Sequence, residues 1–85
     1  MEWIIGLSDR AEKSLKRLPV ADRRRILAAI DAMRADPLAG DVVKLKGQSA
    51  FRRRIGNYRI IFAIDFQALA VAIADIHRRT TTTYR

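Results

Sequence analysis

The chain has 85 residues, enough for one domain (residues 1–85) with a modest core, and it has no cysteine, which excludes disulfides and thiolate metal sites. Its formal net charge is +8 at pH 7 and its pI is about 11.1, so a polyanionic partner is favoured. The N-terminal segment MEWIIG carries an acid and soon turns polar, so we expect no signal peptide, no membrane contact and a cytoplasmic protein.

The first half of the chain predicts a strand followed by two helices. Residues 2–7, EWIIGL, are rich in Trp and β-branched side chains, which is typical of a short strand. Ser8 is a suitable N-cap for an amphipathic helix that Pro19 ends. A second helix is expected over residues 21–34, and the short connection predicts that the two helices pack as an antiparallel pair. The apolar stripe of the second helix is Ile26, Ile30 and Met33, with Leu27 beside it.

The second half predicts a sheet. Residues 36–50 are expected to be mostly loop, because Asp36-Pro37 ends the second helix and further turn residues follow. The apolar period then changes from about 3.6 to 2, which predicts a three-stranded antiparallel meander with a tight turn at Gly56-Asn57. Its strands are expected at residues 51–55, 58–65 and 68–76. The predicted architecture is β-α-α-β-β-β, an α+β fold with a helical hairpin packed on an antiparallel sheet.

The last of these strands has two different faces. One face is expected to carry Leu69, Val71 and Ile73. The opposite face would carry Ala70, Ala72 and Ala74, which are small enough to lie beneath a bulky group.

The excess of positive charge is confined to the second half of the chain. Residues 1–41 hold eight basic and seven acidic side chains, a net charge of +1. Residues 42–85 hold nine basic and two acidic side chains, a net charge of +7. This confinement favours a cationic binding surface over the alternative of a merely solvated face.

The predicted strand FRRRI distributes its arginines over both faces. Its apolar ends are natural core contacts, so Arg52 and Arg54 should project together from the opposite face, about 6–7 Å apart along the strand. Two guanidinium groups at that spacing could hold neighbouring phosphates of a single strand. Arg53 shares the core face and needs a partner, for which Asp75 is a candidate.

More basic side chains are expected near this pair. Arg59 begins the returning strand, where cross-strand pairing can bring it close to Arg54 or Arg52. Additional phosphate contacts could come from Lys44 and Lys46 in the loop, and from His77, Arg78 and Arg79 at the end of the last strand. Because guanidinium groups stabilise the charge that develops on an attacked phosphate, catalysis here would be mainly electrostatic.

No cofactor or metal is expected. The basic half offers only Asp65 and Asp75, and neither has a neighbouring carboxylate. No Ser-His-Asp, paired-carboxylate or glycine-rich phosphate motif is present in the sequence.

Four segments of the chain resemble the RelE/ParE superfamily of bacterial and archaeal toxins: SDRAEKSLKRLP, DPLAGDVVKLKG, FRRRIGNYRIIFAID and IHRRTTTTYR. They span nearly the whole chain, and GNYRIIF is the most specific part. The resemblance implies a toxin of a type II toxin–antitoxin system that a partner antitoxin neutralises by wrapping around it. Within this superfamily, the RelE branch cuts mRNA on the ribosome and the ParE branch poisons DNA gyrase.

The resemblance to the RelE branch also implies a set of catalytic residues: Arg52, Arg54, Arg59, Arg78 and Tyr84. The founding enzyme of that branch has lysines at the positions of Arg52 and Arg54. His77 also stands where that enzyme has a lysine, which implies a supporting phosphate contact. The four threonines before Tyr84 would form an extended spacer that returns the phenol to the arginines, unless Tyr84 is simply a disordered terminal residue.

The predicted function is therefore a metal-independent endoribonuclease toxin that cuts mRNA on the ribosome and inhibits translation. One alternative is a ParE-like toxin that inhibits DNA gyrase and cuts nothing itself. Another is a non-catalytic RNA-binding protein. The expected partners are the ribosome, mRNA and an acidic antitoxin that is partly disordered when free, with a toxin–antitoxin heterotetramer as one assembly.

Overall fold

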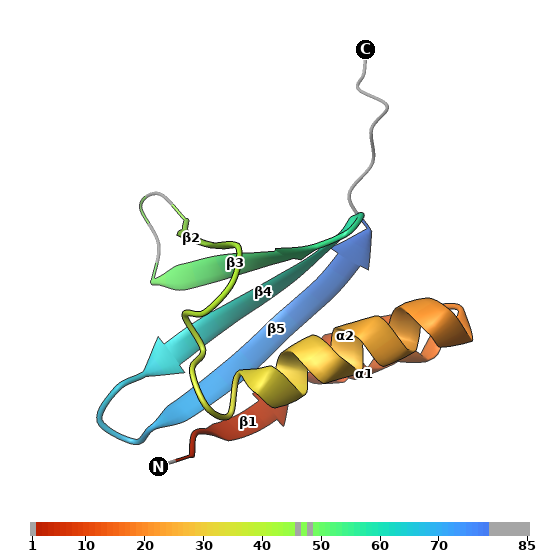
Figure 1. Cartoon of the computed structure of the whole chain (residues 1–85). Helices are drawn as coiled ribbons and strands as arrows, with labels where there is room; N and C mark the ends of the chain where they lie inside the picture. Colours follow the sequence, from red (N-terminus) through yellow and green to blue (C-terminus); the bar gives the residue numbers. More distant parts are fainter. Residues whose placement is uncertain (1, 46, 48, 79–85) are drawn as a thin grey trace.

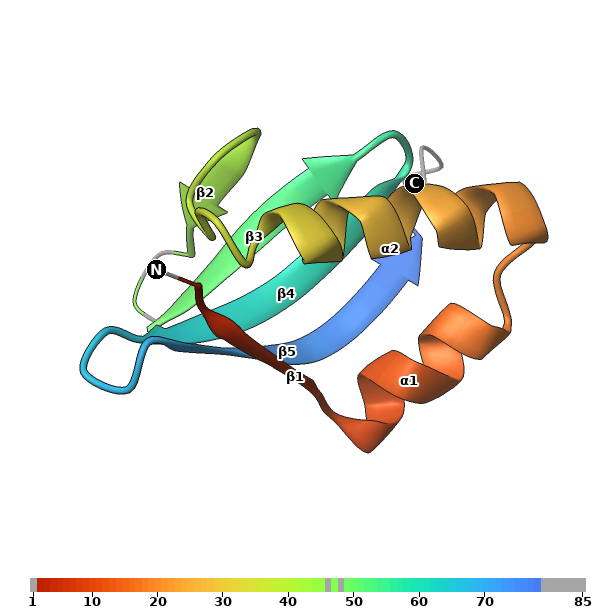
Figure 2. The same cartoon turned by 60° about the horizontal axis from the view of Figure 1, so that its bottom comes forward.

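The computed structural model describes residues 2–45, 47 and 49–78. These residues form a mixed sheet with the strand order β1-β5-β4-β3-β2, in which only β1 and β5 are parallel neighbours. Both helices lie on one face of the sheet and leave the other face uncovered by helix (Figure 1; Figure 2). The predicted α+β fold is confirmed. The elements are β1 (Ile4–Leu7), α1 (Asp9–Lys16), α2 (Val20–Ala32), β2 (Val42–Lys44), β3 (Ala50–Ile55), β4 (Tyr58–Asp65) and β5 (Ala70–Arg78).

Ser8 begins α1 and also attaches it to the sheet. Its hydroxyl oxygen accepts a hydrogen bond from the Ala11 amide at 3.0 Å, which is the predicted N-cap. The same hydroxyl donates to the carbonyl of Ala74 in β5 at 2.6 Å, and the Ser8 amide donates to the carbonyl of Ile73 at 2.9 Å. These bonds position the first helical turn against β5.

The second helix forms the helical hairpin with α1 as predicted. Arg23 joins the two helices, because its guanidinium donates to the carbonyls of Leu15 at 3.3 Å and Leu18 at 3.1 Å. The predicted stripe Ile26, Ile30 and Met33 is buried, whereas Leu27 beside it is 44% exposed. Among the described residues, neither helix is long and apolar enough to cross a membrane.

The core fills the space between the helices and the sheet. Its largest fully buried side chains come from α2, from the residue that follows α2, and from β4 and β5: Phe62, Ile26, Met33, Ile60, Ile73, Ile76 and Val71. Phe62 stacks on Phe51 of β3, with ring centroids 5.6 Å apart. Because the buried residues of β4 alternate, the residues between them, beginning with Arg59, face away from the helices.

One strand was not predicted. The segment expected to be loop contains β2, which pairs with β3 through Val42 opposite Arg53 and Lys44 opposite Phe51. A strand of three residues is too short to show a clear alternation of apolar and polar side chains. Its pairing with β3 defines it, and the composition of the segment itself does not indicate this pairing.

The last strand differs in detail from its prediction. Leu69 was expected within it but precedes β5, with a φ of 54° that places it in a turn. The pairing of β4 with β5 shifts register between Ile61 and Phe62. Beyond this shift Ile76 is buried, which extends the apolar face past Ile73, and the strand continues to Arg78.

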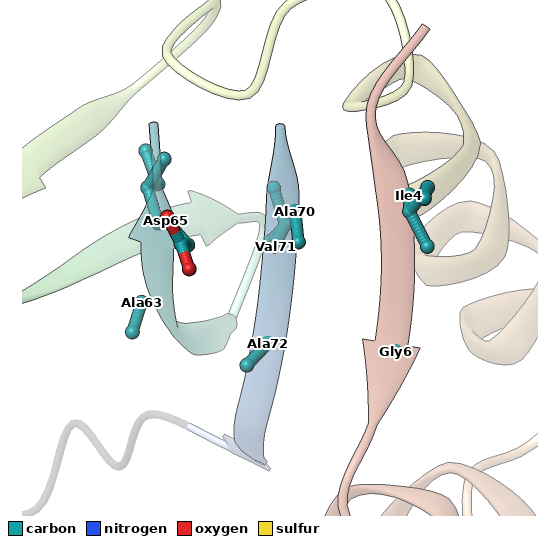
Figure 3. A pocket seen from close by; sticks show the side chains of 8 residues that line it. Ile4, Gly6, Ala63, Asp65, Ala70, Val71 and Ala72 are labelled. Atoms are coloured by element: carbon teal, nitrogen blue, oxygen red, sulfur yellow. The ribbon is translucent and has the colours of Figure 1, made fainter. Parts of the chain in front are cut away.

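The small residues of β5 lie on the face without helices. Ala72 and Ala74 are exposed. Figure 3 shows Ala70 and Ala72 beside Ala63 of β4 and Gly6 of β1, around a shallow apolar hollow of about 410 Å³. The prediction of a small-residue face is confirmed, and this face is a hollow in the surface.

Candidate nucleic-acid interface

The arginines of β3 separate onto two faces as predicted. Phe51 stacks on the buried Phe62, and Ile55 packs against the core, so both face the helices. Since side chains alternate along a strand, Arg52 and Arg54 face the opposite side. The open face of β3 therefore presents two guanidinium groups on one strand.

Arg59 brings a third guanidinium to this face. Its Cα pairs with that of Arg54 on one side and with that of His77 on the other. Side chains of directly opposed residues share a face and lie about 4.5–5.5 Å apart at Cβ. Arg52 occupies the next position of the same face, opposite Ile61. We call Arg52, Arg54, Arg59 and His77 the open-face cation row.

The open-face cation row is only partly neutralised. Arg54 Nε lies 3.6 Å from a carboxylate oxygen of Asp41, and the Arg54 amide donates to the Asp41 carbonyl at 3.0 Å. Among the described residues, the buried Nε atoms of Arg53, Arg54 and Arg59 have no hydrogen-bond partner. Guanidinium groups held side by side on a rigid sheet are suited to binding phosphate oxygens through their terminal nitrogens.

Arg78 does not join this row, contrary to the expectation that it would meet Arg59 in one patch. Its Cα pairs with that of Tyr58, whose phenol faces α2 and donates to Asp22. The side chain of Arg78 is therefore on the helix side of the sheet. Alternation along β5 explains the difference, because it gives the open face to His77 and the helix side to the next residue.

Arg53 and Asp75 do not pair with each other either. Arg53 donates to the carbonyl of Ala39 at 2.8 Å and covers the Cα of Gly40, where an added Cβ would be 2.5 Å from the guanidinium carbon. Asp75 lies 4.0 Å from Arg10 of α1. The prediction of an Arg53–Asp75 pair was wrong, because β5 and β3 are separated by β4 in the sheet.

The predicted loop lysines are also placed differently. Lys44 belongs to β2 and is paired with Phe51, so it lies on the helix side and not beside Arg52 and Arg54. Three other candidate residues lie outside the described residues: Lys46, Arg79 and Tyr84.

The sequence did not predict a polar cluster at the tip of the β3–β4 hairpin. Tyr58 is buried, and its hydroxyl donates to an Asp22 carboxylate oxygen at 2.7 Å. This hydrogen bond, followed by burial and by the charge of Asp22, raises the pKa of Tyr58 above its ordinary value. The sequence signal for this cluster was limited to Tyr58 itself, a tyrosine at a position of β4 that faces the helices. Its partner Asp22 is 36 residues away, so no local pattern links the two.

The family follows from comparison with known proteins. A profile described as "ParE toxin of type II toxin-antitoxin system, parDE" matches residues 5–81, which include every described strand from β2 to β5 and both helices. The chain belongs to the RelE/ParE superfamily of toxins. This confirms the family expected from its sequence.

The relatives of this toxin include RelE proteins. A candidate toxin of Methanocaldococcus jannaschii, RelE1, is 26% identical over 83 residues, covering 93% of this chain and 92% of the relative. RelE in the archaeal RelE–RelB complex of Pyrococcus horikoshii OT3 is 27% identical, with a TM-score of 0.85 over 96% of this chain and 100% of that chain. The isolated RelE toxin of E. coli shares the fold, with a TM-score of 0.81 over 94% of this chain and 87% of that chain, at 14% identity. The chain is thus a RelE-like toxin of a type II toxin–antitoxin system.

Proposed function

We propose that this toxin is a ribosome-dependent mRNA endoribonuclease whose single domain, residues 1–85, inhibits translation by cutting mRNA. The observation that carries the proposal is the open-face cation row, in which Arg54, Arg59 and His77 stand side by side on three adjacent strands. Such a row can bind a phosphodiester and stabilise additional negative charge on it.

In the proposed reaction, the ribose 2′-OH attacks the adjacent phosphorus and the bond to the 5′-oxygen of the next nucleotide breaks. The products are a 2′,3′-cyclic phosphate and a free 5′-OH, so one proton leaves the 2′-OH and one reaches the departing oxygen. Arg59 stabilises the charge on the five-coordinate phosphorus, while Arg52 and Arg54 hold the backbone. His77 can move a proton because a neutral imidazole has one nitrogen that donates and one that accepts.

Further candidate residues extend this proposal. Arg78 contributes positive charge from the helix side of the sheet end. Tyr84 stacks on the target base or assists proton transfer, and the remaining candidates supply phosphate contacts: Lys44, Lys46 and Arg79. The reaction as written uses side chains alone and no metal or other cofactor.

We also propose an antitoxin as the protein partner. Two similar structures are described as RelE–RelB complexes, from Pyrococcus horikoshii and Methanococcus jannaschii. A net charge of +8 favours an acidic partner, and a segment that folds on binding can cover the cation row. A toxin–antitoxin heterotetramer is one assembly that this pairing allows.

A second candidate function is inhibition of DNA gyrase by binding. It is favoured by the family profile, which is that of the ParE toxin, and by the position of Arg78 away from Arg59. The fold does not distinguish the two functions, since both branches of the superfamily share it.

Mapping of RNA ends in a translating extract tests the proposal. We expect the wild-type chain to produce new mRNA 3′ ends at the ribosomal A site, and Arg59→Ala to produce none above background. Intact mRNA together with DNA linearised in complexes with gyrase would overturn the nuclease proposal in favour of the second candidate.

A further inference from the structure

The tip of the β3–β4 hairpin carries a second arginine on its helix side. Arg25 of α2 lies against the turn, so that a Cβ added at Gly56 would be 2.7 Å from a guanidinium nitrogen of Arg25. Gly56 also has a φ of 56°, which favours glycine on conformational grounds. Figure 2 shows the turn beside α2. Arg25 is exposed, so its guanidinium group is presented at the surface of the hairpin tip.

Arg78 lies near the same tip. It is exposed, and its Cα pairs with that of Tyr58, next to the turn. The positive charges of Arg25 and Arg78 both act to lower the pKa of Tyr58, against the larger effect of Asp22. This agrees with positions for both guanidinium groups around the Tyr58 phenol.

Neither of these arginines forms an ion pair with a carboxylate among the described residues. Asp22 stands three residues before Arg25, a spacing that permits an ion pair on a helix. Its carboxylate accepts a hydrogen bond from the Tyr58 hydroxyl at 2.7 Å, so one negative charge lies beside the two positive ones. Within residues 2–45, 47 and 49–78, no ion pair joins a carboxylate to Arg25 or Arg78, whereas Arg54 has Asp41 at 3.6 Å.

We propose that Arg25 and Arg78 form a second phosphate-binding site on the helix side of the hairpin tip, for an RNA strand that crosses this tip from the open-face cation row. The row holds one phosphate of the strand, and Arg25 with Arg78 holds a neighbouring one. The turn residues Gly56 and Asn57 carry no charge, so the RNA meets no carboxylate from the turn where it crosses. This inference rests on the proposed function, because it takes RNA as the ligand.

The salt dependence of RNA binding tests the second site. The probe is a short, fluorescently labelled 2′-O-methyl RNA, which lacks the attacking hydroxyl and cannot be cut. Each phosphate contact to single-stranded RNA contributes about 0.7 to the slope of log K against log salt. We expect Arg25→Ala to make that slope less steep by about 0.7 and to weaken the affinity for RNA at low salt about fivefold. Arg78→Ala should do the same.

Arg24→Ala is the matched control, since it removes the same charge from an exposed position on the same helix. It should keep the wild-type slope, and Arg25→Lys should recover most of the slope lost in Arg25→Ala. Equal slopes for Arg24→Ala and Arg25→Ala would overturn the second site. An Arg25→Ala chain that binds RNA normally but binds antitoxin weakly would also overturn it, because the site would then belong to the protein partner.

The same variants separate this inference from the proposed function. Wild-type protein that cuts no mRNA on ribosomes, but whose RNA-binding slope falls in Arg25→Ala, would contradict the nuclease and support the second site. Protein that cuts mRNA with an unchanged slope in Arg25→Ala would contradict only the second site.

Discussion

Arg53 and Arg54 are neighbours in β3, yet they face two regions of the molecule with different chemistry. On the helix side, Arg53 donates to the Ala39 carbonyl at 2.8 Å and packs on Gly40, so it acts as a structural link between β3 and the preceding loop. On the open side, Arg54 stands beside Arg59, and its Nε lies 3.6 Å from a carboxylate oxygen of Asp41.

Positive charge alone therefore does not identify a binding surface. The run of three arginines in FRRRI looks uniform in the sequence. The two faces of the sheet then divide it into a structural residue and two residues with donors available for a ligand. Substitutions on one face at a time should therefore separate effects on stability from effects on ligand binding.

The largest expected effect is on the helix-covered face. Phe62→Ala removes a fully buried ring that stacks on Phe51, and we expect it to lower the free energy of unfolding by about 3–5 kcal/mol. Chemical denaturation measured by circular dichroism checks this. For comparison, Ala63→Ser on the exposed side of β4 should change stability by less than about 0.5 kcal/mol.

On the open face, Arg59→Ala should act on the reaction and not on the fold. We expect the rate of mRNA cleavage on programmed ribosomes to fall about 10²–10³-fold, the cost of losing one donor to a developing anion. The unfolding midpoint measured in parallel should stay close to the wild-type value. A variant that is folded and cuts mRNA at the wild-type rate would contradict the role of Arg59.

Arg53→Ala should give the reverse pattern. Loss of the hydrogen bond to Ala39 is expected to reduce stability by about 1 kcal/mol, because the group is partly exposed. Cleavage by the folded fraction should remain within about threefold of the wild type, since Arg53 faces the helices. If Arg53→Ala impairs cleavage as strongly as Arg54→Ala, the division of the two faces is incorrect.

The smallest expected effect concerns Tyr58, whose pKa is raised by its hydrogen bond to Asp22. Because the folded-state pKa exceeds the unfolded value of about 10, the stabilisation is complete below that pH and is lost as the pH rises through the folded-state pKa. Thermal unfolding of the wild type and of Tyr58→Phe between about pH 8 and 11 checks this. The difference in Tm should shrink at alkaline pH, and a constant difference would contradict the linkage.

Much of the fold was predictable because its signals are local. Ser8 precedes a helix and caps it, the stripe Ile26, Ile30 and Met33 is buried, and Gly56-Asn57 forms the turn between β3 and β4. The strand β2 was missed because its pairing with β3, and not its own composition, creates it.

The candidate site was predictable where strand alternation alone decides it. The common face of Arg52 and Arg54 and the approach of Arg59 follow from period two and a tight turn. His77 and Arg78 follow the predicted end of the last strand at residue 76, so the sequence did not assign them to opposite faces of the sheet. No sequence pattern indicated that Arg25 would reach the hairpin turn.

Local pattern and composition account for the helices, the long strands, the family resemblance and the concentration of positive charge in the second half, because these depend on neighbouring residues. The partner of each charge depends instead on the tertiary fold. Arg53 meets Ala39, Asp22 meets Tyr58 and His77 meets Arg59 through strand order and register, which bring together residues far apart in the chain. A guanidinium or a carboxylate has many candidate partners of equal chemistry, and their distances in the folded chain select among them.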